Sequence, residues 1–100
     1  MVISEISLTP DNQQFGIVLE GVAYQIRVIW REPCWILDLM DASEKPIVMG
    51  IPLVTGADLL AQYSYLNLGF KLAVICDDSS QDYPTQTDLG TGSHLLVVTE

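Results

Sequence analysis

The sequence predicts a mostly β protein, a small antiparallel sandwich or barrel of about seven strands with one short helix. Apolar and polar residues alternate with a period of two through most of the chain, which is typical of strands with one buried face. Turn-forming residues separate these runs at short intervals, so neighbouring strands are joined by short connections. A single stretch carries apolar residues at helical spacing, and a mostly antiparallel architecture follows from this pattern.

The N-terminal part is expected to form a set of consecutive strands. The first strand places three apolar residues on one face: Val2, Ile6 and Leu8. After a turn over residues 9–12, the run 15–19 alternates and ends at Glu20-Gly21, a pair typical of a tight hairpin. The next run has the clearest alternation in the chain, with one face formed by Val22, Tyr24, Ile26, Val28 and Trp30.

Two more strands are expected after the break at Glu32-Pro33. The first alternates an apolar face with a mixed one: Trp35, Leu37 and Leu39 against Ile36, Asp38 and Met40. The second follows the polar turn 41–46 and is expected to share one face among Ile47, Met49, Ile51 and Leu53. Pro52 has no backbone N–H to donate, so we expect this strand at the edge of its sheet or bent at that residue.

The helical signal follows this strand. Thr55-Gly56-Ala57-Asp58 has the spacing of a capping box, in which the Thr55 hydroxyl accepts a hydrogen bond from a free backbone N–H and the Asp58 carboxylate reaches back. An apolar stripe then appears at helical spacing, formed by Leu59, Leu60, Tyr63 and Leu66. Gly69 is expected to end the helix, which is short enough to depend on packing over the end of a sheet.

The C-terminal part is expected to contain two strands joined by a polar loop. One strand buries alternate residues: Phe70, Leu72, Val74 and Cys76. The loop 77–92 carries four acids and no base, and the run 93–100 closes the chain as a last strand. At 100 residues, we expect one β-rich domain spanning 1–100.

The charge of the chain excludes several classes of partner. Its formal net charge is −9, and only four bases are present: Arg27, Arg31, Lys45 and Lys71. Without a basic patch, we expect neither direct nucleic-acid binding nor attraction to anionic membranes. The opening residues have no basic region and no long apolar run, so we expect no signal peptide, and no segment reaches the length of a membrane span.

The chain is apolar for its size, with 49% hydrophobic and 17% charged residues. Two interpretations remain open: part of this apolar surface lies at subunit contacts, or the strands are hydrophobic on both faces within the domain. Cys34 and Cys76 are solitary and lie inside expected strands, so we expect reduced thiols packed as small hydrophobic groups.

The residues that could hold a metal do not form a known pattern. Four acids in the long loop lack the alternating ligands, central glycine and final glutamate of a calcium-binding EF-hand: Asp77, Asp78, Asp82 and Asp88. A solvated acidic loop is therefore expected. His94 has no second histidine, and the cysteines are far away in sequence, so we expect a hydrogen-bonded or exposed histidine rather than a zinc ligand.

Catalytic arrangements have no better support. A nucleophile pair of Cys34 and His94 is compatible with spacing alone, but no activating motif surrounds either residue. Asp38 and Asp41 are three apart on a strand and point to opposite faces. The glycine-containing segment before the helix lacks the lysine of a phosphate-binding loop. We expect no enzyme activity, no cofactor, and no catalytic, cofactor-binding or metal-binding residue.

Three stretches together resemble a known family. They are WILDLMD with the following KPIVMGIPLVTGADLLAQYSYL, then GFKLAVICDD, then PTQTDLGTGSHLLVV. Their order and spacing resemble the small baseplate plug proteins of contractile-tailed bacteriophages, known from cyanophage-type tails. The resemblance covers residues 15–99.

This resemblance implies a structural virion protein of the tail baseplate that plugs or seals the tail-tube end near the hub and spike. It implies tube, hub and spike proteins as partners, a homo-oligomer of three or six copies about the tail axis, and assembly in the host cytoplasm before incorporation into the virion. The alternative is a small cytosolic β-domain that acts as a ligand-binding or adaptor module.

Overall fold

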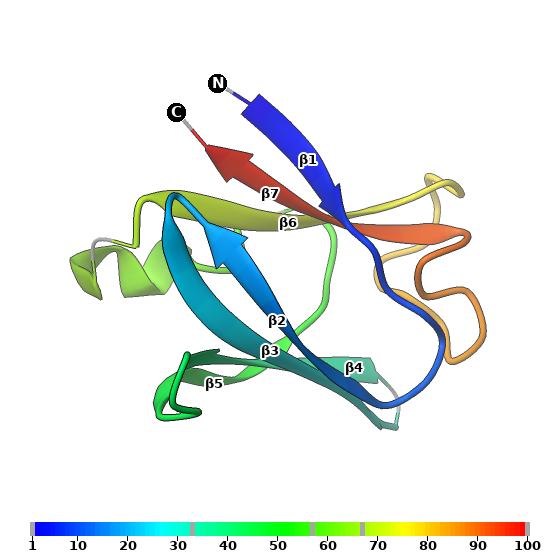
Figure 1. Ribbon diagram of the computed structural model, residues 1–100. Coiled ribbons are helices and arrows are strands. Elements are labelled where there is room, and N and C mark those ends of the chain that lie inside the picture. The colour runs from blue at the N-terminus through cyan, green and yellow to red at the C-terminus, as the bar shows by residue number, and fades with distance from the viewer. Residues whose placement is uncertain (1, 33, 57, 67, 100) are drawn as a thin grey trace.

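Seven strands form two antiparallel sheets in the computed structural model, over the residues that it describes: 2–32, 34–56, 58–66 and 68–99. Their bounds are β1 Val2–Ile6, β2 Gln13–Leu19, β3 Val22–Arg31, β4 Cys34–Asp41, β5 Pro46–Pro52, β6 Phe70–Cys76 and β7 Ser93–Thr99. One sheet has the order β1-β7-β6 and the other β2-β3-β4-β5 (Figure 1). The expected mostly β fold is confirmed. Because β1 and β2 do not pair, the two sheets form an open sandwich and not a closed barrel.

The hydrophobic core lies between the two sheets. The expected alternation along β3 and β4 is confirmed on the inner face, where the fully buried side chains include Ile26, Val28, Leu37 and Leu39. Leu72 and Leu95 meet them from the other sheet. The β2–β3 hairpin turns at Glu20 and Gly21 as expected, and both residues have positive φ, which matches the right-handed twist of the strands.

The strand β5 differs from its expected pattern. Val48 and Ile51 are buried, whereas Met49 is exposed. The shared face expected for four residues is therefore wrong: Ile47, Met49, Ile51 and Leu53. The pairing of β4 with β5 shifts register here, and Gly50 has a φ of 74°, a conformation that glycine adopts without a steric penalty. The bulge exchanges the two faces within the strand. The expected edge position of β5 is confirmed.

The expected helix is a 3-10 turn, η1, which spans Ala61–Leu66 and is kinked at Tyr63. The capping box is wrong. The backbone N–H and the hydroxyl of Thr55 both donate to the carbonyl oxygen of Asp82, at 2.9 and 3.1 Å, so the hydroxyl does not serve a helix start. The Asp58 Oδ1 atom accepts from the N–H groups of Leu60 and Leu72, at 3.0 and 3.3 Å. Ala57 of the expected box and Pro33 of the expected break lie outside the described residues.

The apolar stripe expected beside this turn does reach the core. Leu59 and Leu60 are buried, and Tyr63 and Leu66 pack against the core while half-buried. The turn lies at the end of the molecule where β6 begins (Figure 1). Tertiary contacts of these side chains, rather than helix propensity, therefore hold the segment in place.

Cys34 and Cys76 are free thiols, as expected. No helical segment in the described part of the chain has the length and apolar character needed to cross a membrane.

Candidate functional site

The outer faces of the two sheets differ in chemistry. On the β2-β3-β4-β5 sheet, Asp38 is only 5% exposed although it lies on the outer face. Its Oδ2 atom accepts two hydrogen bonds from Arg27, at 3.0 and 2.7 Å, and its Oδ1 atom accepts the N–H of Gly50 at 2.8 Å. A carboxylate shielded from water is stable when paired and hydrogen-bonded in this way. The buried carboxylate on this outer face therefore has hydrogen-bond partners within its own sheet and needs none from another molecule.

The outer face of the β1-β7-β6 sheet is mostly apolar, although Glu5, Lys71 and His94 also point outward on it. Alternation along the three strands points the following residues away from the core: Ile3, Ala73, Ile75, Leu96 and Val98. We call this set the outer apolar face. Ile3 and Ile75 are 55% and 50% exposed, and no other described strand or helix lies over this face (Figure 1). Contiguous exposed apolar residues on a sheet mark an interaction surface more often than a free surface.

The exposed apolar residues continue at the edges of the sandwich. Val2 on β1 is 58% exposed, whereas Ile6 and Leu8, which were expected on the same face, are buried. Val18 on β2 and Val22, the first residue of β3, are also exposed. The apolar excess of the sequence is thus partly external, which favours subunit contacts over a wholly internal explanation.

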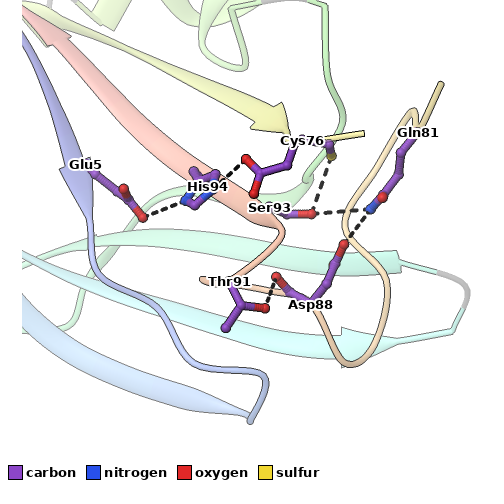
Figure 2. Close-up of polar contacts among 8 residues, drawn as sticks. Glu5, Cys76, Gln81, Asp88, Thr91, Ser93 and His94 are labelled. Carbon is purple, nitrogen blue, oxygen red and sulfur yellow. Dashed lines mark hydrogen bonds and ion pairs between the residues drawn. The ribbon is translucent and has the colours of Figure 1, made fainter. Parts of the chain in front are cut away.

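A polar network closes the end of the sandwich beside this face (Figure 2). Ser93 is fully buried, and its hydroxyl lies 3.4 Å from the Cys76 thiol and accepts from the Gln81 amide at 3.3 Å. The same amide donates to Asp88 at 2.8 Å. Burial alone raises the pKa of Asp88, but the hydrogen bonds from Gln81 and Thr85 outweigh it and lower that pKa.

Asp88 therefore organises the loop. Its Oδ1 atom accepts from the Thr85 N–H at 2.7 Å, and its backbone carbonyl oxygen accepts from three N–H groups, those of Thr91, Gly92 and Ser93. The expectation of a solvated acidic loop is wrong for this residue, which is half-buried. Leu89, beside it, is buried in the core.

His94 lies on the outer side of β7 and links the strands on either side. Its Nδ1 atom is 2.9 Å from Glu5 Oε2 on β1 (Figure 2). Its Nε2 atom is 3.0 Å from the Oδ1 atom of Asp77, the residue after β6. The hydrogen bond to Glu5 is the largest influence and raises the pKa of His94. Partial burial lowers it, and Asp77 raises it further, so the pKa lies above the ordinary 6.5.

The chemical arrangements weighed from the sequence are not brought together. Both ring nitrogens of His94 face carboxylates, and Cys34 lies on the other sheet, so these two residues do not form a nucleophile pair. Asp41 accepts the N–H groups of Ser43 and Lys45 in a turn, separate from the Asp38 network. Within the described residues, no group of three or more His, Cys, Asp or Glu side chains is arranged to hold a metal ion.

One shallow pocket lies between β5 and η1. It has a volume of about 280 Å³ and a mostly apolar lining that includes Ile51, Pro52, Val54, Leu59 and Tyr63. This volume is just below the usual range of small-molecule sites, about 300–1,000 Å³. Asp58 borders the pocket, but its Oδ1 atom already accepts two backbone N–H groups. The pocket fits an apolar side chain of a partner better than a polar ligand.

Comparison with protein families gives one result. The family described as "Cyanophage baseplate Pam3 plug gp18" matches residues 3–100, nearly the whole chain. The chain belongs to this baseplate plug family. No curated protein matches it. The expected resemblance is confirmed, and it extends further toward the N-terminus than residues 15–99.

Membership of the plug family assigns the chain a structural role in a phage baseplate, and hence a place in the virion tail. The outer apolar face suits that role, because a subunit of an assembly is contacted by neighbours. Sequence reasoning did not locate this face. The signal was present in β6 and β7, where the runs LAVI and LLVV are apolar on both faces instead of alternating.

Proposed function

We propose that this protein plugs the end of the tail tube of a contractile-tailed phage, near the hub and spike, and seals the channel before infection. The observation that carries the proposal is the match to the baseplate plug family over residues 3–100. In this proposal the chain acts as one β-rich domain over residues 1–100, without catalysis or a cofactor. Tube, hub and spike proteins are its partners.

Two physical features support this role. The outer apolar face provides area that is stabilised when a neighbour covers it, at roughly 25 cal/mol per Å² of apolar surface buried. The net charge of −9 disfavours adhesion of DNA, so an acidic plug does not bind the nucleic acid that must pass the channel. Neither feature requires contact with a membrane.

We further propose that several copies, three or six, are arranged about the tail axis after assembly in the host cytoplasm. A rotationally symmetric tail requires head-to-tail contacts between copies, in which different surfaces of neighbouring subunits meet. The exposed apolar residues at several places on this sandwich provide such non-identical surfaces.

The test is a phage that lacks this protein, compared with one that carries it. Purified wild-type particles should contain the chain at a few copies per tail by quantitative mass spectrometry, and electron microscopy should place it at the tube end. The deletion should yield incomplete or non-infectious tails, restored by the protein supplied in trans. Infectious particles of normal yield without the protein would refute the proposal. A soluble monomer that binds a small molecule in the pocket beside η1 would instead support the adaptor alternative.

A further inference from the structure

Two of the four sheet edges are closed to another strand. Along β5, Pro46 and Pro52 lack N–H donors and Gly50 introduces a bulge, both of which block strand addition. Along β6, Thr55, Asp58 and Leu59 cover the edge. The Leu59 N–H donates to the Leu72 carbonyl at 2.8 Å, and the Leu72 N–H donates to Asp58 Oδ1 at 3.3 Å.

The other two edges, β1 and β2, carry none of these protections. Neither strand contains proline, lysine or a register shift. Among the described residues, no segment outside the ladders makes a hydrogen bond to the backbone of 2–6 or 13–19. On an antiparallel edge strand, alternate residues direct their N–H and C=O groups away from the sheet. Both edges therefore offer unpaired backbone groups.

These open edges lie on the same side of the sandwich. Soon after β5 ends at Pro52, Thr55 bridges to Val74 and Leu59 donates to Leu72 on the edge of β6, and these contacts close one side. β1 and β2 are the opposite edges of their sheets and face the other side (Figure 1). We call this side the open seam. Phe15 and Ile17 of β2 point inward but stay only half-buried there, so the core is incompletely covered at the seam.

Of the two edges, β1 is the better acceptor of a strand. Val2 and Ile3 expose apolar side chains on both of its faces, and Ile3 continues into the outer apolar face. A strand added to β1 would extend that face, while its inward side chains would cover the half-buried Phe15 and Ile17. The outward residues of β2 are Gln14, Gly16 and Val18, and the Gln14 side chain is already bonded to Glu44.

The charge near β1 determines which strand fits. Glu5 is the one charged residue of β1, and its side chain is 45% exposed on the outer side. Its Oε2 atom lies 2.9 Å from His94 Nδ1, but His94 is shared with Asp77, so this group of three keeps a net negative charge even when His94 is protonated. A lysine or arginine beside it across the ladder would be favourable, whereas a second copy of this chain would bring another net charge of −9. The added strand therefore needs apolar residues at alternate positions and a base on its outward side.

The geometry points to β1 as the acceptor of an extended, alternately apolar and basic segment from another baseplate protein, which completes the open seam by strand addition. This inference deepens the proposed function and rests on it. Backbone hydrogen bonds would provide affinity, and the inward side chains that fit over Phe15 and Ile17 would provide specificity.

The first test uses a nine-residue peptide with valine at alternate positions, threonine between them and a central lysine on the threonine side. Titration of the full chain, followed by amide hydrogen exchange in NMR spectra, should show saturable protection of β1. Ile3→Lys should weaken binding about fivefold or more, because a single cross-strand contact of this kind contributes up to about 1 kcal/mol and the new charge repels the peptide lysine. Val18→Lys is the matched control, since it makes the same change at an exposed outward residue of the other open edge, and it should leave the affinity unchanged.

The outcomes separate the alternatives. Weaker binding of a peptide with glutamate in place of lysine supports the inference, and equal binding contradicts it. The inference is also overturned if the peptide protects the amides of β2 and Val18→Lys abolishes that protection. An absence of saturable binding overturns it as well. Self-association that is lost in both variants would assign the seam to a second copy, with β1 of one subunit beside β2 of the next, and would refute the proposed partner.

A second test uses assembled particles. A photo-reactive residue at position 3 should cross-link to an extended segment of another baseplate protein that has this alternating, basic pattern, and one at position 18 should not. If the chain is present at the tube end but position 3 does not cross-link, the inference fails and the proposed function stands. If the chain is absent from particles, the proposed function itself fails.

Discussion

The Asp38 network permits a quantitative test of what stabilises the four-stranded sheet. Asp38→Ala removes three hydrogen bonds: two from Arg27 and one from the Gly50 N–H. Breaking a buried ion pair by removing one partner typically costs about 3–5 kcal/mol. The Arg27 side chain is 41% exposed, so water recovers part of its interaction. We therefore expect a loss of about 2–3 kcal/mol in the free energy of unfolding.

The sizes of related changes follow from the same contacts. Asp38→Asn keeps an acceptor for the Gly50 N–H and should cost less, about 1–2 kcal/mol. Arg27→Met keeps the aliphatic stem but leaves a buried carboxylate unpaired. The double variant Arg27→Met with Asp38→Leu removes both charges. Its loss of unfolding free energy should therefore be smaller than the summed losses of the two single variants by at least about 1 kcal/mol.

Urea unfolding at pH 7, followed by the fluorescence of Trp30 and Trp35, provides the measurement. Glu44→Ala is the control, because its contact with Gln14 is solvent-exposed and should contribute less than about 0.5 kcal/mol. The reasoning is refuted if Asp38→Ala costs no more than Glu44→Ala, or if the double variant equals the sum of its parts.

Three further predictions concern the loops and the small sheet. Gly90→Ala should destabilise the fold severely, because a Cβ there would lie 1.9 Å from the Leu8 carbonyl oxygen and φ is 85°; Gly21→Ala, with open space around it, should be milder in the same unfolding assay. Asp58→Ala should cost about 0.5–2 kcal/mol, and Asp58→Asn less, since an amide oxygen still accepts the N–H groups of Leu60 and Leu72; equal losses would contradict this. The pKa of His94 is raised in the folded state, so its contribution to stability is complete below pH 6.5 and is lost as the pH rises through the folded pKa. Thermal unfolding from pH 6 to 9 should show this decline, and it should flatten in His94→Gln; an unchanged profile in that variant would remove His94 as its cause.

The parts of the fold that depend on local periodicity were predictable from the sequence. Tyr24, Ile26 and Val28 alternate with more polar residues, and this pattern within one strand predicts which side of the strand is buried. The structure confirms that these three residues are buried. The capping box failed because the partners of Thr55 and Asp58 are distant in sequence: the Asp82 carbonyl and the Leu72 N–H. No local pattern reports such contacts.

The features that matter for assembly were the least predictable. The exposure of Val2 and Ile3 depends on whether β1 pairs with β2, which no local pattern decides. The exposed Met49 depends on a bulge at Gly50 that interrupts the alternation of β5. By contrast, the absence of a motif for catalysis was visible in the sequence itself, and the family match agrees with a structural role.

The pairing of β1 with β7 has a consequence for the order of events during synthesis. The sheet β2-β3-β4-β5 is built from consecutive strands and can form while the ribosome is still adding residues. The other sheet pairs Val2 with Thr99, so β1 can pair with β7 only after nearly the entire chain has been synthesised. A prematurely terminated product that lacks β7 keeps half a sandwich but never presents the outer apolar face.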